Sequence, residues 1–282
     1  MVRSEFEATG SLSTNGQNYW DWYDRGNLLD EKEAYGEAVA CYEKALAVRP
    51  QDYWSWYNRG KVLQALERYE EAIESFKRAI ENRQEDYWSW YSKGYLESEY
   101  IGDYAAAVAS FSRAVQIRPG DYWANFRKAE ALRHWQKYPE AIEAYERAIE
   151  LRYRDFWAWY RRGDAQRHLG NYTAAIESYQ KASSYNSTSE WPWYKQGDCQ
   201  RYLGNYAAAI DCYERASKIV EDDEYAWYNR ACCAAKLGQV NLACQCLQKA
   251  IALNENNREL AKIDGDFESI RNKEEFFCSI AQ

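Results

Sequence analysis

A stretch of eight residues recurs along this chain at a nearly constant interval. In its clearest form it reads YWSWYNRG at residues 53–60, and related copies begin at residues 19, 87, 122, 156, 190 and 224. Successive starts lie 34 residues apart, except for one step of 35. A fixed period of this length is typical of a solenoid, in which each repeat is a pair of helices that buries its apolar face by stacking on its neighbours. We count positions from one at each start.

The second half of each repeat carries a pattern with helical spacing. A large residue, usually tyrosine, is followed three residues later by alanine, four residues further on by a second ring, and three residues after that by alanine again. Spacings of three and four residues place these side chains on one helix face. Small residues there let neighbouring helices approach closely, and the second ring fills the space between them. This second-helix ring is Tyr42, Phe76, Phe111, Tyr145, Tyr179 and Tyr213, with Leu247 in the last repeat.

With these positions in place, the chain resembles a tetratricopeptide repeat (TPR) array of the bacterial type. Repeat two supplies the family's aromatic, Gly, Ala, aromatic and Ala as Trp56, Gly60, Ala72, Phe76 and Ala79. The resemblance implies an all-α fold, a right-handed α-solenoid (superhelix) of seven helix-turn-helix units plus a C-terminal capping helix. The departures are local, since Asn125 replaces the tryptophan, and Ala129 and Ala231 replace the glycine.

We therefore divide the chain into three segments. Residues 1–18 are polar and are expected to be a flexible N-terminal lead-in. Residues 19–257 hold the seven repeats, and the extra residue of the third, between Gly94 and Tyr104, predicts a reshaped helix end. Residues 258–282 place apolar side chains at helical spacing, so they are expected to form a helix that caps the last repeat, with Asp264 and Asp266 as helix-capping acids.

Glycines followed by a short polar residue mark three of the turns inside repeats. These are Gly102, Gly170 and Gly204, and the residues after them are Asp103, Asn171 and Asn205. Each glycine predicts the end of one helix, and each Asp or Asn predicts a side-chain cap for the next.

Composition limits the classes of function. The formal net charge of −8 argues against a general attraction to nucleic acid. No run of eighteen apolar residues exists, so no membrane insertion is expected, and the polar start argues against a secretory leader. The eight cysteines are scattered at helical positions rather than arranged as a disulfide framework, which favours a reducing, cytoplasmic location. Their spacings, with no nearby histidine, predict no metal site.

Two aromatic rows on the first helix of each repeat are the candidate binding surface. The resemblance places positions two and five on the concave side of the array, where large apolar patches mark interaction sites. The alternative is that these rings only pack between tightly wound repeats. Position two is tryptophan in six repeats: Trp20, Trp54, Trp88, Trp123, Trp157 and Trp191. Position five is aromatic throughout, and the candidate residues there are Tyr23, Tyr57, Tyr91, Phe126, Tyr160 and Tyr194.

A shorter basic row accompanies the rings in the later repeats. Arg133, Arg167 and Arg201 share position twelve, and each has an acid three residues before it: Glu130, Asp164 and Asp198. Such a row can bind a carboxylate-bearing partner, or the acids can neutralise it within the helix. The chain's two histidines, His134 and His168, share position thirteen with no nucleophile or third ligand in their register, so we expect no catalytic residues and no cofactor.

The sequence therefore favours a non-enzymatic scaffold that binds an extended segment of another protein in an aromatic-lined groove. Two alternatives stay open. One is a non-protein ligand, either single-stranded RNA stacked on the rings or a glycan, and the other is a purely structural spacer. Self-association also stays open.

Overall fold

The computed structural model describes residues 18–281, so the expected lead-in over residues 1–18 lies outside it except for Asn18, which caps the first helix. The described residues contain helices and no strands. The chain forms two compact units, the first ending at Pro119 and the second beginning at Gly120, and each is described by itself. None of the described helices is both long and apolar enough to cross a membrane.

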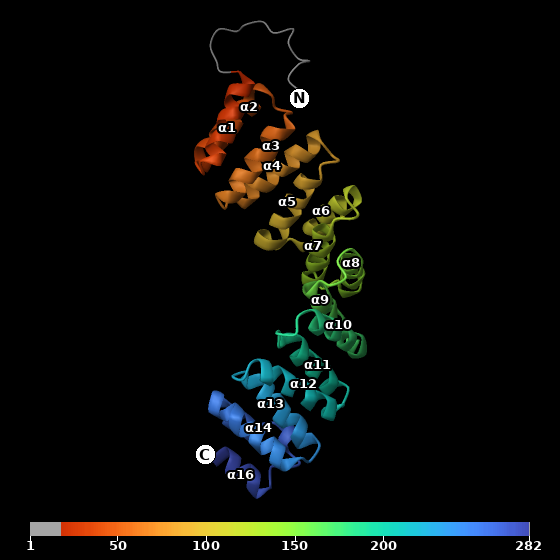
Figure 1. Ribbon diagram of the computed structural model, residues 1–282. Helices are drawn as coiled ribbons and strands as arrows, with labels where there is room; N and C mark the ends of the chain where they lie inside the picture. Colours follow the sequence, from red (N-terminus) through yellow and green to blue (C-terminus); the bar gives the residue numbers. More distant parts are fainter. Residues whose placement is uncertain (1–17, 282) are drawn as a thin grey trace. The chain divides into compact units, whose positions relative to one another are not determined.

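The first unit stacks its helices in chain order (Figure 1). Each repeat contributes one antiparallel pair, and the second helix of a pair also packs on the first helix of the next. The third pair contains a π-helical segment, η1. The elements are α1 (Tyr19–Glu31), α2 (Tyr35–Val48), α3 (Tyr53–Ala65), α4 (Tyr69–Asn82), α5 (Tyr87–Leu96), η1 (Glu97–Ile101) and α6 (Tyr104–Ile117).

The second unit repeats this arrangement with four pairs and closes with shorter elements. The pairs are α7 (Tyr122–His134) with α8 (Tyr138–Leu151), α9 (Phe156–His168) with α10 (Tyr172–Tyr185), α11 (Trp191–Tyr202) with α12 (Tyr206–Ile219), and α13 (Glu224–Lys236) with α14 (Val240–Leu253). The closing elements are α15 (Asn256–Ile263), the 3-10 turn η2 (Gly265–Phe267) and α16 (Glu274–Ala281). Among the described residues the chain is thus an α-solenoid of stacked helix pairs.

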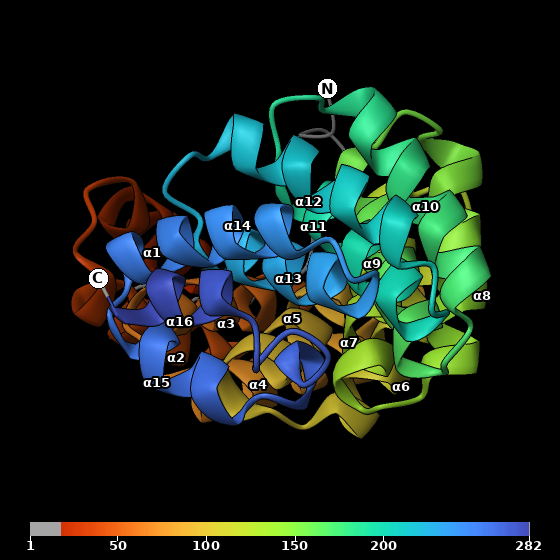
Figure 2. The ribbon, with the colours of Figure 1, turned by 90° about the horizontal axis from the view of Figure 1, so that it is seen from below.

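The C-terminal segment differs from the single capping helix that we expected. It forms α15, η2 and α16, and both helices pack against α14 (Figure 2). Asp264 ends α15 and caps η2 by accepting a hydrogen bond from the Asp266 backbone NH. Phe267, Ile270 and Phe276 are buried in the same core cluster as Leu247. The segment therefore covers the last repeat, but the bend at Asp264 and Gly265 breaks the helix.

Turn residues confirm the expected helix ends and correct two of the expected caps. Gly102, Gly170 and Gly204 have φ near +77°, +76° and +76°, the left-handed region that glycine adopts readily. Asp103 caps α6 through its side chain, but the Asn171 and Asn205 side chains make no capping bond. The extra residue of the third repeat is absorbed by η1, as a reshaped helix end at this place required.

The second-helix ring packs against a glycine at position eight of the first helix. A Cβ atom added to Gly26, Gly60, Gly163 or Gly197 would lie 2.7–2.8 Å from an atom of that ring, closer than real Cβ contacts come. At Gly94 the nearest approach is 3.1 Å. The glycine therefore sets how closely the two helices of a repeat pack.

A hydrogen bond from the second-helix ring explains the residue at position nine. Tyr42, Tyr179 and Tyr213 donate to Asn27, Asp164 and Asp198 at 2.9, 2.8 and 2.8 Å, and Tyr145 donates to Glu130. Where the second-helix ring is phenylalanine or leucine, position nine holds Lys61, Tyr95 or Cys232 instead of an amide or acid. A buried hydroxyl requires an acceptor and a phenyl ring does not, so the two positions change together along the chain.

This pairing predicts opposite results for two substitutions of Asp198. Asp198→Leu leaves the buried Tyr213 hydroxyl without its acceptor and should lower the free energy of unfolding by about 1–3 kcal/mol. Asp198→Asn keeps an acceptor, as Asn27 does for Tyr42, and removes a carboxylate whose pKa burial raises. At pH 7 its free energy of unfolding should equal or exceed that of the wild type, as measured by urea unfolding.

The pH dependence of the Asp198→Asn variant provides a second check. Because the folded-state pKa of Asp198 lies above its unfolded value, the wild-type carboxyl gains protons on folding. Any advantage of the amide is therefore largest above the folded pKa and disappears as the pH falls toward the unfolded value of about 4. If Asp198→Asn proved as unstable as Asp198→Leu, this would contradict the role of position nine as the acceptor for the Tyr213 hydroxyl.

Candidate functional site

The six position-two tryptophans, which we call the Trp row, are all half exposed. Their exposed fractions lie between 47% for Trp123 and 55% for Trp20. The row therefore does not consist of rings sealed between repeats. Three members lie in the first unit and three in the second, and each is the second residue of an eight-residue copy, at the start of a first helix.

In the first five repeats, the rings at positions one and five hold the row tryptophan edge-on. In the second repeat, Trp54 makes edge contacts with Tyr53 and Tyr57, at centroid distances of 4.9 and 6.4 Å, and Tyr53 stacks on Tyr57 at 6.0 Å. The first, third, fourth and fifth repeats repeat this triad. Edge-to-face geometry of this kind is favourable for aromatic pairs.

Position five is more buried than we expected for residues that face a ligand. Phe126 and Tyr160 are buried, whereas Tyr23, Tyr57, Tyr91 and Tyr194 are partly buried. Each ring contacts the second-helix ring of its own repeat, as Tyr160 does with Tyr179 at 5.6 Å. The position-five rings therefore support the Trp row from below, and only the tryptophans present a large exposed face.

Arginines that sequence reasoning missed lie over the position-one rings. Each directly follows the second helix of its repeat, at the C-cap. The distances from the guanidinium carbon to the ring centroid are 4.4 Å for Arg49 and Tyr19, 5.3 Å for Arg83 and Tyr53, 4.4 Å for Arg118 and Tyr87, and 4.3 Å for Arg152 and Tyr122. The recurrence of arginine at one place in four successive repeats was the signal that could have found them.

The position-four tryptophans have a different role from the Trp row. In four of the six, the indole NH group donates to a backbone carbonyl of the preceding link. The donors Trp56, Trp90, Trp159 and Trp227 reach Pro50, Gln84, Tyr153 and Glu221 at 2.7–2.9 Å. These four tryptophans connect α3, α5, α9 and α13 to the link before each helix, which is a structural role.

The basic row at position twelve is partly buried and only partly neutralised as expected. Arg133 forms a hydrogen-bonded ion pair with Glu130 at 3.1 Å. The other two acids pair instead with the base three residues before them, Asp164 with Arg161 at 3.4 Å and Asp198 with Lys195 at 3.9 Å. The predicted pairing is thus correct in the fourth repeat only.

The remaining two arginines of that row face different surroundings. Arg201 donates to Asn229 at 2.9 Å and lies 3.9 Å from Asp266. Nearby Tyr179, Asp164 and Asp198 raise the pKa of Arg167. Arg167 and Arg201 therefore face a cluster of polar groups of their own repeat and the next one.

Stacking accounts for one of the two exposed histidines. His168 lies parallel to Tyr138, the first residue of the preceding second helix, with centroids 4.9 Å apart. Burial and the neighbouring Arg167 lower the pKa of His168, which favours its neutral form. Tyr172 stacks on Tyr202 in the same way one repeat later. At position thirteen, His168 and Tyr202 thus make the same kind of stacking contact between repeats.

One cluster has the composition of a metal site. The potential ligand atoms of Cys232, Asp264 and Asp266 lie within 4.8 Å of one another. Asp264 already accepts from the Tyr228 hydroxyl at 2.9 Å, and Asp266 pairs with Lys236 at 3.1 Å. Burial raises the pKa of Cys232, so its thiol stays protonated at neutral pH. These contacts fit a structural junction between the last repeat and η2, in which Asp264 is a capping acid as expected and Asp266 forms an ion pair instead of a cap.

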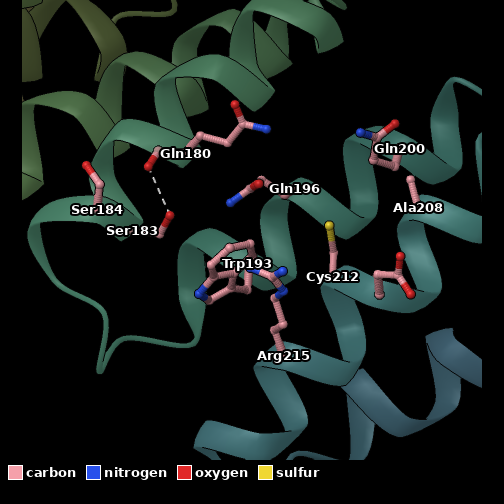
Figure 3. A pocket seen from close by; sticks show the side chains of 10 residues that line it. Gln180, Ser183, Ser184, Trp193, Gln196, Gln200, Ala208, Cys212 and Arg215 are labelled. Atoms are coloured by element: carbon pink, nitrogen blue, oxygen red, sulfur yellow. Dashed lines mark hydrogen bonds between the residues drawn. The ribbon is translucent and has the colours of Figure 1, made fainter.

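A pocket of about 530 Å³ opens in the sixth repeat (Figure 3). Gln180, Gln196 and Cys212 line it, and Arg215 lies over Trp193 at 4.5 Å. The side-chain nitrogen of Gln196 is buried without a hydrogen-bond partner. Burial raises the pKa of the Cys212 thiol to about 11, so a reactive thiolate does not form at neutral pH.

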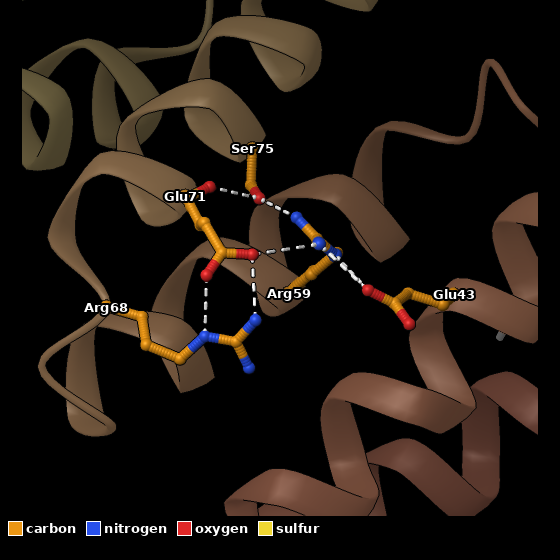
Figure 4. A network of polar contacts seen from close by, with 5 residues as sticks. All are labelled: Glu43, Arg59, Arg68, Glu71 and Ser75. Carbon is orange, nitrogen blue, oxygen red and sulfur yellow. Dashed lines mark hydrogen bonds and ion pairs between the residues drawn. The ribbon is translucent and has the colours of Figure 1, made fainter.

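The equivalent place in three other repeats is bridged by an ion pair. Arg59 at position seven donates to Glu43 of the previous repeat at 2.8 Å and to Ser75 at 2.7 Å, next to the Arg68–Glu71 pair (Figure 4). Arg162 and Arg230 reach Glu146 and Glu214 in the same way. In the sixth repeat the pair becomes Gln196 and Gln180, which carry no charge. The pocket in the sixth repeat is thus lined by two uncharged amides, whereas the smaller pocket beside Glu43 and Arg59 is lined by their ion pair.

Family models match most of the repeats. Models described as tetratricopeptide repeat or TPR repeat match residues 26–67, 53–86, 99–152, 126–187, 191–223 and 224–257. No curated protein matches this chain.

Many solved structures are similar in fold. A structure titled as YrrB, "a TPR protein with an unusual peptide-binding site", has a TM-score of 0.58 and 19% identity over 66% of this chain and 95% of that one. The C-terminal part of a TPR repeat-containing protein from Cytophaga hutchinsonii has a TM-score of 0.70 and 14% identity over 88% and 99%. A MamA structure from Desulfovibrio magneticus has a TM-score of 0.56 and 20% identity over 61% and 96%. At these identities the likeness concerns the fold alone.

The two tryptophan positions predict unequal losses of stability within one helix, α9. Trp159→Ala removes a side chain that is 9% exposed and its hydrogen bond to the link, and should lower the free energy of unfolding by about 3 kcal/mol or more. Trp157→Ala removes a half-exposed ring and should cost about 1 kcal/mol. Chemical denaturation of the two variants measures the difference, and equal losses would show that the Trp row is structural.

Proposed function

Because the chain belongs to the tetratricopeptide repeat family, we propose that it is a non-enzymatic scaffold that binds an extended segment of another protein on the Trp row. The exposure of that row carries the proposal. Each indole could have been replaced by a polar residue without opening the core, yet the chain repeats it six times. Tryptophan and tyrosine are also the residue types most enriched at binding hot spots.

The spacing of the row suits an extended chain. One tryptophan recurs at the start of the first helix in each of the first six repeats, so these repeats each offer one half-exposed indole at an equivalent place. The rings at positions one and five restrict the indole before any ligand arrives, which lowers the conformational entropy lost on binding. YrrB, whose title names a peptide-binding site, is consistent with this use of the fold.

Charge favours a protein segment over nucleic acid. The net charge is −8, and the arginines that lie over the position-one rings already have an aromatic partner in the chain. A nucleic acid would need free cations along the row to neutralise its phosphates. Binding of RNA, of a glycan or of a second copy, and a role only as a spacer, are the competing outcomes of the test.

Peptide selection tests the proposal directly. A displayed library of random dodecapeptides is panned on the immobilised chain, and the affinity of each selected peptide is measured by calorimetry. Two variants, Trp54→Ala/Trp88→Ala in the first unit and Trp123→Ala/Trp157→Ala in the second, should each remain folded. At least one should lose about tenfold or more in affinity, since hot-spot truncations cost 1.4 kcal/mol or more.

A control variant separates the row from exposed tryptophan in general. Trp135 is 43% exposed and lies outside the row, at the C-cap of α7, so Trp135→Ala should leave the affinity unchanged. Binding of apolar segments should also change little between low and high salt, whereas RNA binding would fall steeply. Failure to select any peptide would refute the proposal. Wild-type affinity in both folded double variants would also refute it.

A further inference from the structure

The first four repeats use their own arginine to cover the aromatic cluster beside the Trp row. Arg49, Arg83, Arg118 and Arg152 each lie over a position-one tyrosine at 4.3–5.3 Å. Three of them also approach the row tryptophan of the same repeat at 5.3–5.6 Å. A guanidinium over an aromatic face is attracted by the ring quadrupole. The face of the position-one tyrosine, beside the row tryptophan, is therefore a cation-binding position, which we call the seat. These repeats fill it with their own arginine.

The sixth repeat has lost the arginine but kept the tryptophan. Val220 stands where the first four repeats have arginine, and Glu190 stands where they have tyrosine. Trp191 is nevertheless 54% exposed, and Tyr225 at position two of the next repeat is 66% exposed. Over the described part of the chain, no arginine or lysine lies within cation–π distance of Trp191 or Tyr225. The sixth repeat thus lacks the internal arginine, and the cation over a neighbouring ring is Lys195, which lies 5.4 Å from the centroid of Tyr194.

A pocket of about 490 Å³ occupies this place in the second unit. Its apolar wall is formed by Trp191 and Tyr194 of α11, Val220 of the link and Tyr225 of α13. The equivalent link in the first repeat, at residues 49–52, also borders a pocket, and there the arginine is present. The pocket in the sixth repeat therefore offers space beside Trp191, at the place where Arg49 supplies a guanidinium group in the first repeat.

Carboxyl groups surround the pocket and favour a cation. Glu190, Asp222, Asp223 and Glu224 line it. Asp223 is engaged in capping α13, and Glu224 accepts from Asn254 at 3.1 Å. Glu190 and Asp222 form no ion pair with any residue that the structure describes. The link reads Val-Glu-Asp-Asp here and Arg-Pro-Gln-Asp in the first repeat, so negative charge is concentrated where the internal arginine is missing.

We propose that the pocket between Trp191, Val220 and Tyr225 binds the guanidinium group of an arginine in the partner segment, at the place where the first four repeats hold their own. The assignment rests on the peptide-binding function proposed above and names one side chain of that peptide. Arginine can stack on a ring and pair with carboxylates through one planar group. A phosphate would be repelled by the four carboxyl groups, and an apolar side chain would desolvate them without compensation.

Titration with two short peptides tests the assignment on the full chain. The probes are acetyl-Gly-Gly-Arg-Gly-Gly-amide and the same peptide with citrulline, which keeps the shape of arginine and lacks its charge. Binding is followed by NMR at low salt. The arginine peptide should bind about tenfold or more tightly than the citrulline peptide, because cation–π attraction and two exposed ion pairs together supply at least that factor. Equal binding of the two peptides would overturn the proposal.

A substitution at Val220 shows whether binding occurs at this pocket. Val220→Arg restores the residue found in the first four repeats, so the variant should fold and fill the seat from within. It should weaken the arginine peptide about tenfold, whereas the matched Val220→Leu variant should leave its affinity unchanged. Undiminished binding in Val220→Arg would place the arginine elsewhere and refute the site.

The same variant separates this inference from the general function. Val220→Arg leaves Trp54, Trp88, Trp123 and Trp157 unaltered. If library-selected peptides depend on those tryptophans while the arginine peptide fails to bind at this pocket, the scaffold function stands and the arginine seat does not.

Discussion

Contact between the position-eight glycine and the second-helix ring determines how closely the two helices of a repeat pack. The second-helix ring lies so close to the position-eight glycine that a Cβ would come within 2.7–2.8 Å of it in four repeats. The two helices of a repeat are held at this short distance, and the rings beneath the Trp row pack on the same second-helix ring. In the last repeat the glycine is replaced by Ala231 and the ring by Leu247, both in one core cluster. Because five of the seven repeats reuse the glycine–ring contact, their surface residues also recur at equivalent places.

That regular frame separates two tryptophans that lie only two residues apart in sequence. The position-four indole turns toward the preceding link and donates its NH to a carbonyl there. The position-two indole stands against two neighbouring rings and leaves half of its surface exposed. The first ties repeats to their links, and the second is available to a partner. Variation then acts on single positions of the frame, and in the sixth repeat it replaces an arginine with Val220 and an ion pair with Gln180 and Gln196.

Periodicity made the helix pairs and the Trp row predictable, since equivalent positions in a solenoid have equivalent surroundings. Side-chain partners were less predictable. The acids before Arg167 and Arg201 pair with Arg161 and Lys195 instead, whereas Glu130, which also accepts from a tyrosine hydroxyl, pairs with Arg133 as predicted. The break in the C-terminal cap depends on packing of Phe267 and Phe276 that local spacing does not reveal. Arg49 and its three counterparts recur at one repeat position in the sequence, yet only the structure shows the rings beneath them.

Fluorine NMR of the chain labelled with 5-fluorotryptophan tests the central claim most directly. The claim is that the position-two indoles meet a partner while the position-four indoles hold the fold. On titration with a library-selected peptide, resonances of some of Trp20, Trp54, Trp88, Trp123, Trp157 and Trp191 should shift or broaden, and those of Trp56, Trp90, Trp159 and Trp227 should stay in place. Shifts confined to the position-four set, with the Trp row unaffected, would contradict the account.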